Sequence, residues 1–103
     1  HVYVVAMGGE GDGVDVHVRM YAPGSGVAED PATGSAAAAL GGYLSAAEGS
    51  EEASLAWVVE QGIEMGRPSI LHVEADRAGG TTSAVRVGGG AVRVSRGIMA
   101  IPS

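Results

Sequence analysis

The feature that most constrains this chain is a helix-forming stretch without a single charge. Residues 33–47 read TGSAAAALGGYLSAA, and Gly49 follows as a suitable end because glycine readily takes the left-handed conformation that closes helices. No charged residue lies between Gly34 and Ala47. A surface helix carries one polar face, whereas a helix that is apolar all round is buried all round. The stretch therefore predicts a helix that other elements enclose.

The rest of the chain is typical of β-strands separated by turns. Residues 1–7 are apolar and rich in valine, and residues 14–22 alternate between apolar and polar side chains with the period of a half-buried strand. We expect these two segments to form a hairpin around a turn at 8–13, followed by a loop at 23–30. The remaining strands are expected at 54–62, at 69–76, and as a last pair at 84–87 and 91–101 around Gly88-Gly89-Gly90, with a glycine turn expected at 77–82.

One helix and about six strands, with no strand–helix–strand alternation, predict an α+β protein. We expect a curved, mostly antiparallel sheet wrapped around one buried central helix, in a single domain covering residues 1–103. The 18 glycines suit such a sheet, since tight turns and sharp bends need them. The chain begins at His1 inside an apolar run, and we interpret it as part of a longer polypeptide.

Composition excludes several classes of function. The formal net charge is -6, and all six basic residues are arginines. Such a chain lacks the clustered cations of a nucleic-acid surface and the lysine of a P-loop. It has no cysteine, which excludes disulfides, a thiol nucleophile and cysteine-ligated zinc. No uncharged stretch is apolar enough for a membrane span or a signal peptide. We expect a cytoplasmic protein with neither nucleic acid nor membrane as a partner.

Chemistry is expected where the predicted helix begins, within the sequence EDPATGSA at residues 29–36. The first helical turn leaves backbone N–H groups without partners and favours an anion. Gly34 lets a ligand approach the backbone, and the hydroxyls of Thr33 and Ser35 add donors, so a small carboxylic acid would be held here. Asp30, just upstream, would exchange a proton with it. The alternative is that Asp30 or Thr33 caps the helix, the commoner role of these residues. Both interpretations stay open.

Other candidate motifs are weak. His17 and His72 fall on the polar faces of strands, where a solvated histidine is commoner than a metal ligand. The glycines of residues 9–13 are not followed by a helix, which argues against a dinucleotide site. We therefore expect neither a metal nor a cofactor.

Three motifs follow one another in a specific order along the chain. They are Arg19-Met20-Tyr21-Ala22-Pro23, Glu29-Asp30-Pro31-Ala32-Thr33-Gly34-Ser35-Ala36 and Gln61-Gly62-Ile63-Glu64-Met65-Gly66-Arg67-Pro68-Ser69. Their succession resembles the phenazine-biosynthesis PhzF family, and so does the ending from Val87-Gly88-Gly89 to Gly97-Ile98-Met99. The resemblance covers essentially the whole chain, with Tyr21 where the family more often has phenylalanine.

The resemblance implies a diaminopimelate-epimerase-like fold of two similar lobes with the active site between them. It also implies a cofactor-independent isomerase that moves a proton on a small carboxylic acid of the dihydro-hydroxyanthranilate kind, and a homodimer. Residues 1–103 would be the C-terminal lobe. The principal acid/base glutamate of the family and a neighbouring histidine lie in the missing N-terminal lobe. We therefore expect this chain alone to be inactive.

The same resemblance assigns roles to individual residues. Asp30 is expected to be catalytic, at the position where related racemases and epimerases have a cysteine. The residues Thr33, Gly34, Ser35 and Ala36 are expected to bind substrate. The alternative is a non-catalytic small-acid-binding or interaction module on the same scaffold. A phosphate or nucleotide site at the helix start is a weaker third possibility, because the chain has no lysine.

Structural roles are expected for two arginines. Within residues 61–69, the glycines and Pro68 are expected to shape a turn, with Arg67 paired to an acidic or backbone group. Arg19 is expected to pair with a carboxylate such as Asp15 or Glu29 rather than with substrate.

Overall fold

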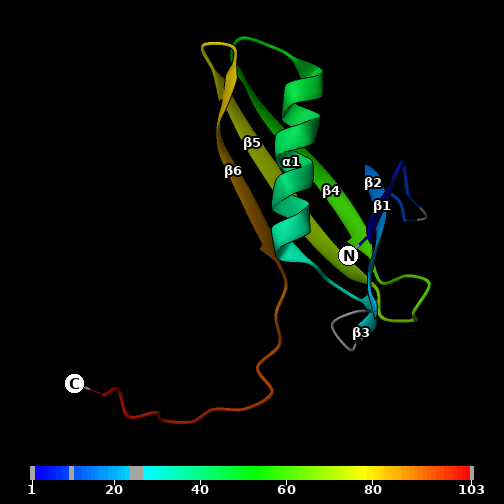
Figure 1. Ribbon diagram of the computed structural model, residues 1–103, viewed down its shortest axis with the longest axis vertical. Coiled ribbons are helices and arrows are strands. Elements are labelled where there is room, and N and C mark those ends of the chain that lie inside the picture. Colours follow the sequence, from blue (N-terminus) through cyan, green and yellow to red (C-terminus); the bar gives the residue numbers. More distant parts are fainter. Residues whose placement is uncertain (1, 10, 24–26, 103) are drawn as a thin grey trace.

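The computed structural model describes residues 2–9, 11–23 and 27–102. These residues form six strands and one helix (Figure 1). In chain order the elements are β1 (Val2–Met7), β2 (Val16–Ala22), β3 (Val27–Asp30), α1 (Gly34–Glu48), β4 (Ala53–Gln61), β5 (Ser69–Ala78) and β6 (Thr81–Gly89).

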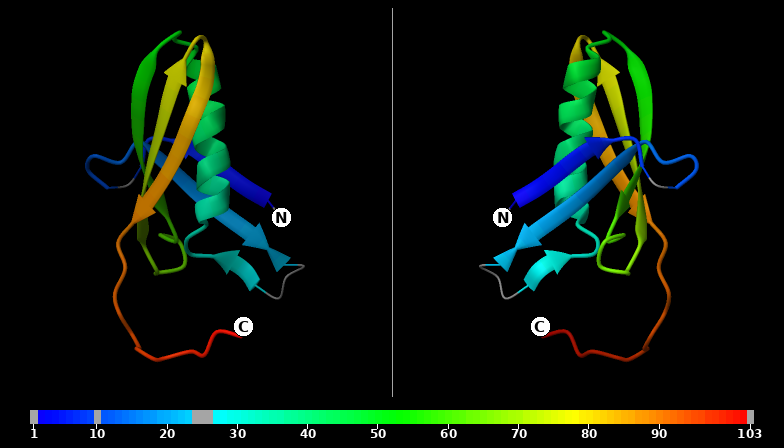
Figure 2. Two further views of the ribbon diagram at one scale, coloured as in Figure 1. Left: turned by 90° about the vertical axis from the view of Figure 1, so that its left-hand side faces the viewer. Right: turned by 90° about the vertical axis from the view of Figure 1, so that its right-hand side faces the viewer.

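All strands belong to one sheet in the order β1-β2-β4-β5-β6, and β3 pairs with β2 beside this path. The pairs are antiparallel except for β2 with β4, which run parallel. The sheet curves around α1, and its edges β1 and β6 lie on opposite sides of the helix (Figure 2). The expected α+β class, with a curved and mostly antiparallel sheet, is therefore confirmed. The predicted hairpin of the first two strands is confirmed as well, with Val5 opposite Val18.

The core lies between α1 and the inner face of the sheet. Ala37 and Leu40 of the helix meet a layer of buried aliphatic side chains: Val16, Val18, Val59, Leu71 and Val73. At Gly41 the helix comes so close to β5 and β6 that an added Cβ would lie 2.7 Å from Cγ1 of Val73. Within the described residues, no helix has the length and apolarity needed to cross a lipid bilayer.

The sheet does not cover α1 on every side. Ala39, Ala46 and Ala47 are exposed on its outer side, and Tyr43 is 71 % exposed. The uncharged helix was expected to be buried all round, and that expectation is wrong for this chain by itself. Alanine, glycine and tyrosine make the exposed side apolar or neutral rather than charged, so sequence pattern alone does not distinguish it from the buried side.

Two predicted segments differ in the structure. Residues 27–30 form β3 instead of a loop, and residues 81–89 form one continuous strand instead of part of a pair around Gly88-Gly89-Gly90. The turn between β5 and β6 lies at Gly79 and Gly80, which both have positive φ, and this confirms the glycine turn expected at 77–82. Residues 90–102 are extended without strand pairing and leave the body of the sheet (Figure 1).

Candidate functional site

Asp30 is the last residue of β3 and lies four positions before the first residue of α1. The chain turns between them, and Thr33 has the extended conformation of a residue that precedes a helix, with φ -129° and ψ 95°. The strand and the helix thus hold the short segment 30–33 at both ends. This segment places a carboxylate beside the N-terminus of α1.

Both oxygens of the Asp30 carboxylate accept hydrogen bonds from the same segment. Oδ2 accepts a bond from the Thr33 hydroxyl at 2.7 Å, and Oδ1 accepts one from the Ala32 N–H at 3.3 Å. Thr33 makes no side-chain capping bond to the helix. The first backbone bond of α1 runs from the Ala37 N–H to the Thr33 carbonyl at 3.1 Å. Asp30 therefore stabilises the turn that leads into the helix, and the capping interpretation does not describe its contacts.

The backbone at the start of α1 is accessible. Gly34 and Ser35 are exposed, and no atom lies within 4 Å of the point where a Cβ of Gly34 would be. Ala36 is half-buried. In the described part of the chain no side chain caps these first N–H groups, so they keep the partial positive charge of a helix N-terminus. The geometry can receive an anion next to the carboxylate of Asp30.

Gln61, the last residue of β4, contacts the segment 30–33 and is fully buried. Its Oε1 accepts a bond from the Thr33 N–H at 3.1 Å. Its Nε2 donates to the Asp30 carbonyl at 2.8 Å and to the Thr33 hydroxyl at 2.9 Å. From the sequence, Gln61 is expected only as part of the turn motif at 61–69. A polar amide at the buried end of a strand was the signal that could have singled it out.

The turn that follows β4 has the predicted shape. Gly62 and Gly66 have positive φ, and the Arg67 N–H donates to the Gly62 carbonyl at 2.9 Å. A Cβ on Gly62 would lie 2.2 Å from the Arg67 carbonyl oxygen and 2.9 Å from that of Pro31. The turn therefore packs directly against the segment that carries Asp30. The side chain of Arg67 is exposed.

Arg19 pairs with Glu29, one of the two partners expected. Its Nε and one terminal nitrogen donate to the two carboxylate oxygens at 3.1 and 2.8 Å, a bidentate pair that joins β2 to β3. The guanidinium carbon also lies 5.1 Å from the ring centre of Tyr21. These contacts give Arg19 the structural role that was expected and hold β3 in place one residue before Asp30.

His17 is not the solvated histidine that was expected. Its Nδ1 lies 2.7 Å from Oε1 of Glu60, which is only 2 % exposed, and its Nε2 lies 2.5 Å from Oε2 of Glu64. The hydrogen bonds with these two carboxylates raise the pKa of His17. Spacings of 43 and 47 residues left no local signal for this cluster. His72, by contrast, is exposed as expected.

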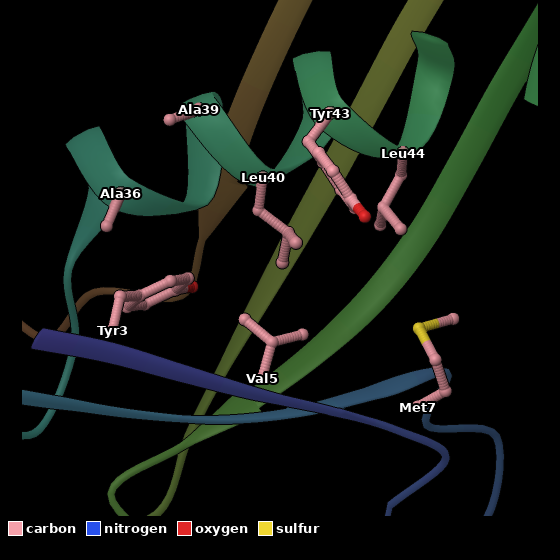
Figure 3. Close-up of a pocket in the computed structure, with 8 residues that line it drawn as sticks. All are labelled: Tyr3, Val5, Met7, Ala36, Ala39, Leu40, Tyr43 and Leu44. Atoms are coloured by element: carbon pink, nitrogen blue, oxygen red, sulfur yellow. The ribbon is translucent and has the colours of Figure 1, made fainter. Parts of the chain in front are cut away.

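An apolar groove of about 600 Å³ runs between β1 and α1 (Figure 3). Tyr3, Val5 and Met7 of the strand face Leu40, Tyr43 and Leu44 of the helix across it. Ala36, in the first turn of α1, lines the end nearest the candidate site. Across residues 2–9, 11–23 and 27–102, no three histidine, aspartate or glutamate side chains are arranged to hold a metal ion.

Comparison with known proteins identifies the family. The sequence profile of the phenazine biosynthesis-like protein family, PhzC-PhzF, matches residues 1–97. The chain belongs to this family. The resemblance drawn from the three motifs is thereby confirmed, and relatives of the chain are named as isomerases.

The chain is 46 % identical over 81 residues to an uncharacterized isomerase of Mesorhizobium japonicum, an alignment that covers 79 % of this chain and 27 % of that protein. It is 39 % identical over 83 residues to trans-2,3-dihydro-3-hydroxyanthranilate isomerase of Pseudomonas chlororaphis, covering 81 % and 30 % of the two chains. The enzyme of the same name from Pseudomonas aeruginosa is 39 % identical over 79 residues, covering 77 % and 28 %. The PhzC-PhzF chain described here thus spans less than a third of these curated relatives.

Proposed function

We propose that this chain is the C-terminal lobe of a two-lobed, cofactor-independent isomerase that moves a proton on a small carboxylic acid of the trans-2,3-dihydro-3-hydroxyanthranilate kind. The name of the Pseudomonas relatives supports the reaction and the substrate class. The observation that carries the proposal is the placement of Asp30 beside an uncapped and exposed helix N-terminus. In this proposal the missing N-terminal lobe supplies the principal glutamate and the histidine, and two such proteins form a homodimer in the cytoplasm.

Each group has one task in the proposed reaction. The N–H groups of Gly34, Ser35 and Ala36, with the Ser35 hydroxyl, bind the substrate carboxylate at the positive end of α1. A C–H bond of the substrate breaks as its proton passes to a carboxylate, and a proton returns to a different position, so the product has the same atoms as the substrate. Asp30 exchanges one of these protons. Thr33 holds Asp30 in place through its hydroxyl.

Replacing Asp30 with asparagine tests the proposal in the two-lobed protein. The asparagine would keep the size of the side chain but would not exchange protons, so D30N should lower kcat on trans-2,3-dihydro-3-hydroxyanthranilate by about 10²–10⁴-fold. The melting temperature should change little, because the amide oxygen of asparagine can still accept the Thr33 hydroxyl bond and no capping bond to α1 is lost. Steady-state kinetics and thermal unfolding measure both quantities.

Asp12→Asn is the matched control, because Asp12 is an exposed carboxylate in the connection between β1 and β2. This variant should keep the kinetics of the parent protein. A D30N protein with a lowered melting temperature and unchanged kcat would show that Asp30 acts only in folding. Tight binding of the acid without any turnover in the parent protein would favour the binding-module alternative.

A further inference from the structure

Gln61 makes more contacts with the candidate site than a turn residue needs. Its amide uses one acceptor and two donors, all on residues Asp30 and Thr33. The orientation of the amide is fixed, because the Thr33 N–H can only donate and the Asp30 carbonyl can only accept. The side chain has no exposed surface, so water does not compete for these bonds.

The Gln61 amide also fixes the direction in which the Thr33 hydroxyl donates its proton. A hydroxyl has a single proton to donate. Nε2 of Gln61 already donates to Oγ1 of Thr33, so the hydroxyl proton is directed to Oδ2 of Asp30, 2.7 Å away. A chain of donors thus runs from Gln61 through Thr33 to Asp30. It occupies one lone pair of Oδ2, and the Ala32 N–H occupies one lone pair of Oδ1, so each oxygen keeps a lone pair for another proton.

Backbone packing also holds the segment 30–33 in place. Gly62 lies against the Pro31 carbonyl, closely enough that a Cβ there would approach its oxygen to 2.9 Å. Gln61 and Gly62 together therefore tie residues 30–33 to the end of β4. Since β4 is a central strand of the sheet, the position of Asp30 relative to α1 depends on this connection.

We propose that Gln61 is a positioning residue of the isomerase, which orients the Asp30 carboxylate for proton transfer through the Thr33 hydroxyl. This inference rests on the proposed function. It goes beyond that function by assigning a positioning task to a buried residue whose amide hydrogen-bonds to Asp30 and Thr33. A misplacement of about 1 Å in a reacting group lowers rates by about 10²-fold, so a modest shift of the carboxylate suffices to expose the role.

The test compares Gln61→Glu, Thr33→Val and Thr33→Ser in the two-lobed protein, with trans-2,3-dihydro-3-hydroxyanthranilate as substrate. Q61E keeps the side-chain size but removes the two donors. T33V keeps the shape of threonine and removes the hydroxyl, whereas T33S keeps the hydroxyl. We expect Q61E and T33V to lower kcat by about 10–100-fold with KM nearly unchanged, and T33S to stay within about threefold of the parent.

The double variant Q61E/T33V should lose no more than about threefold beyond the worse single variant, since both changes break one chain of donors. Should Q61E fail to fold, the comparison of T33V with T33S still decides. The inference is overturned if T33V keeps the kcat of T33S. It is equally overturned if T33V raises KM at constant kcat, because the hydroxyl would then act on substrate binding.

D30N, assayed in parallel, separates this inference from the proposed function. If D30N turns over like the parent protein, the role of Asp30 is wrong and the role of Gln61 falls with it. If D30N is inactive while Q61E and T33V are fully active, only the role of Gln61 is wrong.

Discussion

The contacts of His17 show how one side chain joins three parts of the sequence. Glu60 of β4 and Glu64 of the following turn bind its two ring nitrogens, and Nε of Arg19 lies 3.8 Å from the other oxygen of Glu64. The loop before β2 closes over this cluster, because the Gly11 N–H donates to Oε2 of Glu60 at 3.4 Å. A protonated imidazole offers a donor to each carboxylate, so both contacts favour the charged histidine.

This arrangement makes stability depend on pH. The pKa of His17 is raised by its hydrogen bonds with Glu60 and Glu64. Its contribution is therefore fully present below the pKa of an unfolded histidine, about 6.5, and is lost as pH rises through the folded pKa. The hydrogen bond with His17 lowers the pKa of Glu64, and that contribution is lost only as pH falls through the folded pKa of Glu64.

We expect the free energy of unfolding of this chain to decline as the pH rises from about 6.5 through the raised folded pKa of His17, with the greater part of the decline removed by His17→Gln. Urea unfolding across this range measures it. His72→Gln is the matched control, because His72 is an exposed histidine on β5 and its loss should leave the decline intact. An unchanged decline in H17Q would show that other groups cause it.

At the scale of elements, two adjacent glycines of α1 face different surroundings. A Cβ on Gly41 would lie 2.7 Å from Cγ1 of Val73 and 3.0 Å from Cγ1 of Val85, whereas nothing lies within 4 Å of a Cβ on Gly42. Alanine is favoured over glycine within a helix by about 1 kcal/mol. At Gly41 that gain is opposed by overpacking against the β-branched side chains of Val73 and Val85, which costs about 1–3 kcal/mol.

Gly42→Ala should therefore stabilise the chain by about 1 kcal/mol, and Gly41→Ala should destabilise it. The two variants add the same atoms to neighbouring positions, so each is the control for the other. Chemical denaturation followed by circular dichroism measures the difference. Equal effects of the two alanines would show that α1 does not approach β5 and β6 as closely as the structure has it.

The strands and the helix could be predicted from sequence wherever local pattern carries the information. Residues 14–22 alternate because one face of β2 is buried, and residues 33–47 lack any strand-like alternation. β3 was missed because its four residues are too few to show a period. The glycine turn expected at 77–82 is present, but a second turn expected at Gly88-Gly89-Gly90 is not, although three successive glycines are typical of a turn. Pairing with β5 keeps Gly88 and Gly89 in strand β6, and this strand register is not visible in a single sequence.

In the candidate site, too, the local contacts could be predicted from the sequence and the long-range contacts could not. Asp30 and Thr33 are three residues apart, so their contact lies within the reach of local reasoning. Gln61 reaches Thr33 across 28 residues of sequence, a contact that exists only because β4 ends beside the turn from β3 to α1. The helix start could be proposed from sequence as an anion site, whereas the residues that hold it in place could not.

At the scale of the whole molecule, one apolar surface remains open. It consists of the β1 side chains Val5 and Met7 and the α1 side chain Tyr43, which are 40 %, 66 % and 71 % exposed. β1 is an edge strand, and the buried hydroxyl of Tyr3 has no hydrogen-bond partner within the described residues. Monomeric soluble proteins rarely leave such apolar patches uncovered. The curated relatives are more than three times as long as the part that matches this chain, so the proposed two-lobed protein has ample sequence to cover it.

Tyr43→Lys distinguishes a covered surface from an open one. In the 103-residue chain alone, Y43K should leave the free energy of unfolding within about 0.5 kcal/mol of the parent, as is usual for exposed positions, and should reduce self-association. In the two-lobed protein the same change should destabilise by more than about 2 kcal/mol, because it would bury an unpaired charge. Ile70→Lys is the control, since Ile70 is 43 % exposed on the outer face of β5, away from the helix. Denaturant unfolding and sedimentation velocity of both proteins give the comparison. Equal stability of Y43K in the short and long chains would mean that the rest of the polypeptide does not cover this surface.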